Sequence, residues 1–239
     1  MEIQKSCWLL VGGRSRLGRA LAEALAPDHR LVLTSSKPWD EESHWLESLS
    51  KRTRVRTFQW NADAPELLPT MMADLKSLRD TGITLENAVI VAGTFPKSSF
   101  GDWDPTSLES TWRLNLSFPL LVSQAVGPQL AEGGCLQFLL DTAIYRPFVK
   151  HMPYSAAKAG LAALVPTLAK LLAPKVRVVG HAIGTALPNE GDDPVTLAEG
   201  SLLKRLGSPE DLVRALRYAA ESPYLTGEIL TLDGGRRWA

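Results

Sequence analysis

Tyr154 and Lys158 are the two side chains in this sequence best suited to moving a proton. They stand four positions apart, and residues with this spacing lie on the same face of an α-helix. A free phenol has a pKa of about 10, but a neighbouring ammonium favours its ionised form. We therefore expect Lys158 to lower the pKa of Tyr154 and the pair to act in acid–base catalysis. An ordinary Tyr–Lys pair on a helix surface is the alternative.

Asp141 precedes Tyr154 by thirteen residues and directly follows an apolar run at residues 136–140. An ionised carboxylate only accepts hydrogen bonds, so it would repel the oxygen of an aldehyde or a ketone. A nitrogen heterocycle with N–H donors would bind there instead, and Asp141 with Tyr154 would relay a proton to a ring nitrogen. The alternative is that Asp141 caps a loop and that Thr142 supplies the catalytic hydroxyl.

Short apolar runs alternate with longer segments of helical periodicity along the chain. The runs predict strands at residues 8–11, 30–34, 55–60, 88–92, 136–140, 176–181 and 229–232. The longer segments predict helices at residues 17–26, 65–80, 106–130, 154–172 and 209–220. This alternation is typical of an α/β, Rossmann-type fold, with a doubly wound, seven-stranded parallel sheet. We expect a single domain at residues 1–239 with a substrate loop near residues 184–205.

The composition favours small-molecule chemistry. Lys plus Arg and Asp plus Glu number 26 each, and this balance argues against binding of nucleic acid or of an anionic membrane. The apolar stretch at residues 7–13 is too short for a signal peptide or a membrane span, so we expect a cytoplasmic protein. Cys7 and Cys135 are expected to be buried free thiols. No Cys/His/Asp cluster has metal-ligand spacing, and His151 and His181 are expected in solvated or core roles.

A dinucleotide site is predicted after the first strand, where VGGRSRLGRALAEALA turns directly into an Ala- and Leu-rich helix. Such a turn brings backbone N–H groups and a helix N-terminus to a pyrophosphate. The residues expected to contact the cofactor here are Gly12, Arg14, Ser15, Arg16, Leu17 and Gly18. A tight strand-to-helix turn with a solvated arginine is the alternative.

The end of the second predicted strand indicates which cofactor binds. It reads Ser35, Ser36 and Lys37, without an Asp or Glu to accept hydrogen bonds from both ribose hydroxyls of NAD. Hydroxyls and a lysine suit a 2′-phosphate, so we expect NADPH. An ordinary polar turn is the alternative.

These motifs together resemble the short-chain dehydrogenase/reductase family over the whole chain. The resemblance implies that Lys158 also binds the nicotinamide ribose, that Asn115 holds a water beside this lysine in a proton relay, and that the protein is a homotetramer. An amide that only stabilises a helix bend is the alternative for Asn115. Further cofactor contacts are expected from residues after other strands, which are Asn61, Ala92, Gly93 and Gly184.

Three residues narrow the resemblance to the pteridine reductase branch, which includes the bacterial dihydromonapterin reductases: Arg16 in the glycine turn, Asp141 in place of the usual serine, and Phe95 after Ala92-Gly93. The branch implies that Phe95 stacks on a pterin and that Arg16 reaches toward the cofactor phosphate and the pterin. Asp141 and Tyr154 would face the pteridine edge. The implied reaction is reduction of a 7,8-dihydropterin by NADPH, with dihydromonapterin or dihydrobiopterin as substrate and dihydrofolate as a weaker one.

Two alternatives remain, and four positions depart from the motifs of the family. One is a carbonyl reductase of 3-oxoacyl or similar ketone substrates in which Thr142 replaces the serine. The other is a catalytically silent NADP(H) sensor, against which the complete acid–base set argues. The departing residues are Val11, Val91, Val179 and Ile183.

Overall fold

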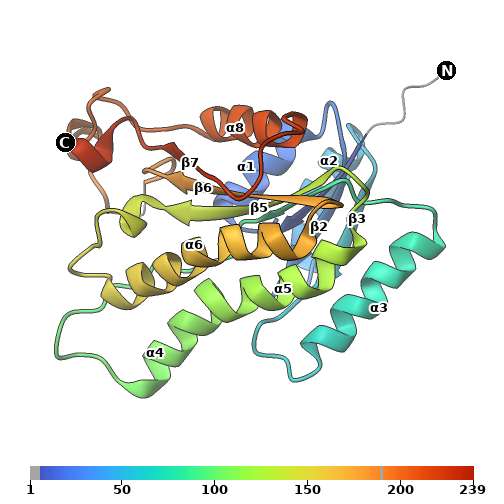
Figure 1. The fold of residues 1–239 in the computed structure, drawn as a ribbon, viewed down its shortest axis with the longest axis horizontal. Helices are drawn as coiled ribbons and strands as arrows, with labels where there is room; N and C mark the ends of the chain where they lie inside the picture. Colours follow the sequence, from blue (N-terminus) through green and yellow to red (C-terminus); the bar gives the residue numbers. More distant parts are fainter. Residues whose placement is uncertain (1–5, 189–190) are drawn as a thin grey trace.

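One parallel sheet organises the protein, whose computed structural model describes residues 6–188 and 191–239 (Figure 1). The strands are β1 (Cys7–Val11), β2 (Arg30–Ser35), β3 (Val55–Gln59), β4 (Asn87–Ile90), β5 (Gly134–Asp141), β6 (Val176–Ile183) and β7 (Ile229–Leu232). Their order is β3-β2-β1-β4-β5-β6-β7, so the direction of winding reverses between β1 and β4. The predicted seven-stranded, doubly wound α/β fold is confirmed.

Helices cover both faces of this sheet (Figure 1). Four of them, α3, α4, α5 and α6, lie on one face, and α1, α2 and α8 lie on the other. The short α7 belongs to the loop that follows β6. The helices are α1 (Arg16–Leu25), α2 (Ser43–Ser50), α3 (Leu67–Asp80), α4 (Pro105–Trp112), α5 (Phe118–Val126), α6 (Met152–Leu172), α7 (Pro194–Glu199) and α8 (Pro209–Glu221).

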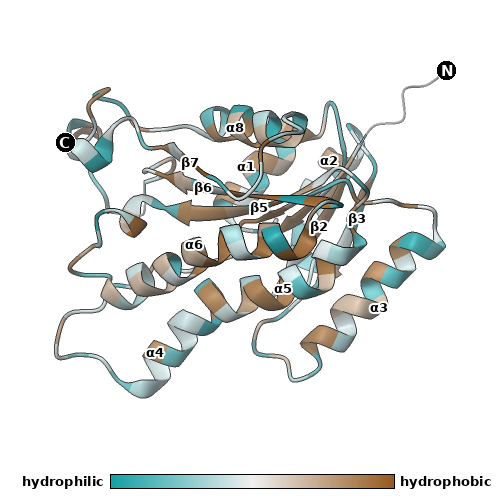
Figure 2. Ribbon diagram, viewed as in Figure 1, coloured by the Kyte–Doolittle hydropathy of each residue, from teal (hydrophilic) through white to brown (hydrophobic). Residues whose placement is uncertain are grey.

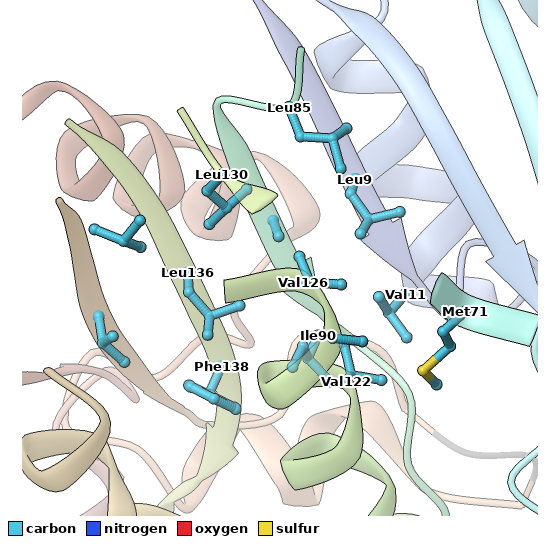
Figure 3. Packing of buried hydrophobic residues seen from close by; sticks show 14 of the residues in the cluster. Leu9, Val11, Met71, Leu85, Ile90, Val122, Val126, Leu130, Leu136 and Phe138 are labelled. Carbon is cyan, nitrogen blue, oxygen red and sulfur yellow. The ribbon is translucent and has the colours of Figure 1, made fainter. Parts of the chain in front are cut away.

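Because helices cover both faces, the central strands β1, β4, β5 and β6 are buried almost throughout and are mostly apolar, as Figure 2 shows. The edge strands β3 and β7 are only partly buried. In β1, Leu9 and Val11 pack toward α3 and α5, whereas Trp8 and Leu10 pack toward α1 and α8. Figure 3 shows side chains of the first cluster, in which strand residues meet Val122 and Val126 of α5 and Met71 of α3. Both cysteines are buried free thiols, as predicted.

The single helix predicted for residues 106–130 is wrong in one respect, because it is interrupted. After α4, residues Arg113–Ser117 form a π-helical segment, and a 3₁₀ turn follows α5. The Asn115 side chain explains the wide turn. Its Nδ2 donates to the Thr111 carbonyl at 3.0 Å. In a regular α-helix this carbonyl would accept from the Asn115 backbone N–H instead. The amide of Asn115 therefore does shape the helix, as the structural alternative proposed.

Two further features concern single helices. Neither α2 nor α7 was predicted, since each is shorter than the window over which helical periodicity can be seen. Among the described residues, α6 alone has the length and apolar composition of a membrane span. Leu161 and Val165 of α6 are nevertheless buried against the sheet, as expected for a core helix.

The Phe138→Ala variant tests this packing. Phe138 on β5 is fully buried, so its truncation leaves a cavity and should lower the free energy of unfolding by about 3–5 kcal/mol. Urea denaturation measures this change. The matched control is Phe100→Ala at a side chain that is 84% exposed, which should change stability by less than about 0.5 kcal/mol. Equal effects of the two substitutions would contradict the described core.

Candidate active site

The predicted site residues meet at the carboxyl ends of the central strands, close to the reversal of winding. A pocket of about 460 Å³ opens there, and its lining includes all four predicted catalytic side chains. A larger pocket of about 670 Å³ lies alongside, between α8 and the end of β7, and contains none of these four. The four catalytic candidates in the first pocket are Asn115, Asp141, Tyr154 and Lys158.

The glycine turn after β1 has the geometry that a bound pyrophosphate requires. Gly12 has a φ of +95°, a conformation that favours glycine. A Cβ on Gly18 would stand 2.3 Å from the Gly12 carbonyl oxygen, so no larger residue fits this contact. Ser15 caps α1, because its Oγ accepts a hydrogen bond from the Gly18 N–H at 3.0 Å. Arg16, which stands where the family has a glycine, begins α1, and its Nη1 donates to the Pro188 carbonyl at 2.9 Å.

A third pocket of about 410 Å³ lies beside the turn and is lined by Ser35, Ser36 and Lys37 at the end of β2. It shares Ser15, Gly93 and Thr94 with the catalytic pocket, so the two form one continuous groove. Such a groove suits a dinucleotide with its adenosine end at β2 and its nicotinamide end at Tyr154. Every predicted cofactor residue lines this groove except Gly18, which packs beneath the turn.

Tyr154 and Asp141 are directly connected. The Tyr154 hydroxyl donates a hydrogen bond to Asp141 Oδ2 at 2.9 Å, between the first turn of α6 and the last residue of β5. The other carboxylate oxygen, Oδ1, accepts from the Ala143 N–H at 2.7 Å and so caps the 3₁₀ turn Thr142–Ile144. Asp141 therefore caps the turn with one oxygen, as the alternative interpretation expected, and contacts Tyr154 with the other.

Lys158 and Asn115 both lie next to Gly93. A Cβ at Gly93 would stand 2.8 Å from Asn115 Oδ1 and 3.6 Å from Lys158 Nζ, so the absence of a side chain lets the two approach. Lys158 Nζ donates to the Leu139 carbonyl at 2.9 Å. Asn115 Oδ1 accepts from the Thr94 N–H at 3.3 Å. The residues that the sequence assigned to a relay are thus neighbours.

Burial dominates the protonation of these groups. It lowers the pKa of Lys158 from 10.5 to about 8, against the opposing attraction of Asp141. It also raises the pKa of Asp141, against hydrogen bonds from Ala143 and Tyr154. The expected lowering of the Tyr154 pKa by Lys158 is wrong for this arrangement: burial and the Asp141 carboxylate hold it well above its ordinary value. Tyr154 is thus a neutral hydrogen-bond donor at neutral pH.

Phe95 stands at the mouth of the pocket and is 40% exposed. Its ring meets the Tyr154 ring edge-on, with centroids 4.8 Å apart. His151 stacks on Phe95 at a centroid distance of 3.7 Å and donates from Nδ1 to the Pro96 carbonyl at 2.8 Å. This role of His151 was not predicted, because the contact joins two loops that are far apart in the chain. His181, by contrast, is a core residue as expected, bonded to Gln137.

Arg236 is a further cation at the catalytic pocket, beside Arg16 and Lys158, and its role there was not predicted from the sequence. It comes from the segment after β7, lines the catalytic pocket and donates to the Leu197 carbonyl of α7 at 2.9 Å. It therefore ties the C-terminal segment to the predicted substrate loop. Of that loop, residues 189–190 lie outside the described residues. Within the described residues, no cluster of His, Cys, Asp and Glu could hold a metal ion.

A doubly wound sheet with a glycine turn after β1 and a Tyr–Lys pair beside β5 defines a dinucleotide-dependent oxidoreductase. Residues 12–237 match the family described as enoyl-(acyl carrier protein) reductase, and the chain belongs to this group of short-chain dehydrogenases/reductases. Nodulation protein G of Azospirillum brasilense is 28% identical, over 95% of this chain and 96% of that protein. Dihydromonapterin reductase of Enterobacter sp. (strain 638) is 25% identical, over 95% of each chain.

Among solved structures, FolM alternative dihydrofolate reductase 1 from Brucella suis, in complex with NADP, superposes with a TM-score of 0.87. The match covers 99% of this chain and 97% of that one. At 22% identity it shows that the fold is shared.

The Lys158→Met variant tests the burial of this ammonium. Between the folded pKa of about 8 and the unfolded value of 10.5, the unfolded wild type binds more protons than the folded protein. Its stability should therefore rise with pH relative to the variant, by about 2–3 kcal/mol across this window. Urea denaturation at pH values on both sides measures the difference. Lys170→Met, at an exposed lysine of the same helix, is the control, and identical pH dependence of both variants would contradict the prediction.

Proposed function

We propose that this protein is a reductase that uses NADPH to convert a 7,8-dihydropterin, such as dihydromonapterin or dihydrobiopterin, into the tetrahydropterin. Dihydrofolate would be a weaker substrate. The observation that carries the proposal is the 2.9 Å hydrogen bond from the Tyr154 hydroxyl to Asp141 Oδ2, at the position where a carbonyl reductase needs a hydroxyl donor. The similarity to dihydromonapterin reductase supports it.

Asp141 determines the class of substrate in this proposal. When ionised it offers only acceptor atoms, which match the ring N–H and amino donors along a pterin edge and repel a carbonyl oxygen. Its pKa is raised by burial, so the side chain is also a better proton carrier near neutral pH than an exposed aspartate. The neighbouring Thr142 does not take over as a donor, because its hydroxyl is directed to Asp141 Oδ1 at 3.5 Å.

The reaction consumes one hydride and one proton at a C=N bond of the dihydropterin. NADPH, when bound in the groove, would supply the hydride. Tyr154 would deliver the proton to the ring nitrogen. Asp141, which accepts a hydrogen bond from the Tyr154 hydroxyl, would restore it, with Lys158 Nζ 5.8 Å from the centroid of the Tyr154 ring. Asn115 beside Lys158 would hold the water that connects this pair to solvent. Phe95, backed by His151, offers an aromatic edge against which a flat ring can pack.

The preference for NADPH follows from the groove beside β2. Ser35, Ser36 and Lys37 line it together with Arg14, so hydroxyls and cations surround the place that a 2′-phosphate would take. No carboxylate stands at the end of β2 itself, where an NAD-binding protein would hold the ribose hydroxyls. Arg16 lines the catalytic part of the groove, as the pterin proposal requires.

We further propose that this enzyme, which acts on a small molecule, is a homotetramer. Two kinds of contact would join its four chains. One uses the outer face of α6, which carries exposed Ala156, Ala159 and Ala163. Small residues let two helices approach closely. The other uses β7, an edge strand whose pairing partner on one side would be another copy.

Kinetics of Asp141 variants test the substrate class. Asp141→Ala should lower turnover of dihydromonapterin and dihydrobiopterin by at least about 100-fold, because the acceptor and proton carrier is lost. The loss of NADPH absorbance measures it, beside a panel of ketones. Tyr154→Phe is the control for genuine catalysis, since turnover that survives in this variant does not come from the site. Turnover of ketones alone in the wild type, or a gain of pterin activity in Asp141→Ser, would refute the proposal.

Light scattering tests the assembly. The wild type should have the mass of four chains, and Ala159→Arg should leave dimers, because a large cation on the outer face of α6 removes one of the two contacts. Lys170→Met, on the same helix, should remain tetrameric. A monomeric wild type would contradict the proposed assembly.

A further inference from the structure

Arg14, the arginine of the glycine turn, is held by two acidic residues from the segment after β2. Its Nε donates to Glu42 Oε1 at 3.0 Å, and its Nη2 is paired with Glu41. Its Nη1 donates to the Pro38 carbonyl at 2.6 Å. The guanidinium is therefore fixed on three sides by one short segment, residues 38–42, before any ligand arrives.

The two glutamates differ in how firmly they are bound. Glu42 is 10% exposed and also pairs with Arg19, so it lies buried between two cations. Breaking a buried pair is costly because the remaining charge is left uncompensated. Glu41 has a side chain that is 79% exposed, and an exposed ion pair contributes little. Glu42 thus anchors Arg14, whereas Glu41 can be exchanged for another anion.

Arg14 lines the same pocket as Ser35, Ser36 and Lys37. A phosphate on the 2′ position of the adenosine ribose would enter between these groups. A phosphate carries more charge than a carboxylate and accepts paired hydrogen bonds from a guanidinium. It would therefore compete with Glu41 for Nη2 while Glu42 keeps Nε in place.

We propose that Glu41 is an internal competitor for the 2′-phosphate and that Glu42 is the residue that positions Arg14 to receive it. The pair sets how strongly this enzyme distinguishes NADP(H) from NAD(H). The inference rests on the proposed preference for NADPH and deepens it, because it assigns the discrimination to an exchange of anions on one arginine.

The two glutamates should respond in opposite directions to the same chemical change. Glu41→Gln removes the competitor and should tighten NADP⁺ binding by about twofold to fivefold, the size of one exposed ion pair. Glu42→Gln releases the Arg14 side chain and should weaken NADP⁺ binding by at least about tenfold. NAD⁺ has no 2′-phosphate, so its affinity should stay unchanged in both variants.

Isothermal titration calorimetry with NADP⁺, NAD⁺, 2′-AMP and 5′-AMP tests this proposal without any substrate. Asp40→Asn is the matched control, because it removes one exposed negative charge from the same segment and Asp40 is one residue from Glu41. Tighter binding of NADP⁺ and 2′-AMP to Glu41→Gln, but not to Asp40→Asn, supports the competition between Glu41 and the 2′-phosphate for Arg14. The gain should shrink at high salt, which screens exposed pairs.

Three outcomes would overturn the inference, and they are separable from failure of the proposed function. If Asp40→Asn and Glu41→Gln tighten NADP⁺ binding equally, the negative charge of the whole segment weakens binding. Glu41 then does not compete with the 2′-phosphate for Arg14. Unchanged NADP⁺ affinity in Glu41→Gln would mean that no competition exists. A loss of NAD⁺ affinity in Glu42→Gln equal to that of NADP⁺ would mean a damaged fold. A wild type that prefers NAD⁺ refutes the proposed cofactor itself.

Discussion

The site depends on a lysine ammonium held inside the protein. Lys158 is 6% exposed, and its charge is supported by the Leu139 carbonyl and by attraction to Asp141. Both partners lie at the carboxyl end of β5, which is fixed in the middle of the sheet by pairing with β4 and β6. The protonation of Lys158 therefore depends on the position of β5. If β5 were displaced, the buried ammonium would lose both the Leu139 carbonyl and the attraction of Asp141.

Asp141 links this charge to the proton donor and also completes the local fold. Its Oδ1 ends the strand by capping the next turn, and its Oδ2 receives the Tyr154 hydroxyl. A serine at this position could not make both contacts in the same way, because it has one side-chain oxygen. The change from hydroxyl to carboxylate therefore alters which substrate atoms find a partner and also how the loop after β5 is held.

Much of the fold could be predicted, because buried parallel strands appear in the sequence as short apolar runs. The spacing of Tyr154 and Lys158 also places both side chains on one face of a helix. The protonation of Tyr154 could not, since it depends on burial and on a carboxylate from another element. The stacking of His151 on Phe95 joins two loops, and no local pattern encodes such a contact. The carboxylates that hold Arg14 come from a segment too short and too polar to show periodicity.

The π-helical segment Arg113–Ser117 has a consequence for how the helical layer tolerates change in length. A π turn holds one residue more than an α turn, and α4 and α5 follow each other along nearly one line on either side of it (Figure 1). Because the π turn takes up the extra residue within a single turn, removing one residue here would restore a regular α-helix and leave α5 in its present orientation relative to α4. Val122 and Val126 would still face the sheet, whereas Asn115 would lose the wide turn that places it beside Gly93. The extra residue thus serves the relay and not the core.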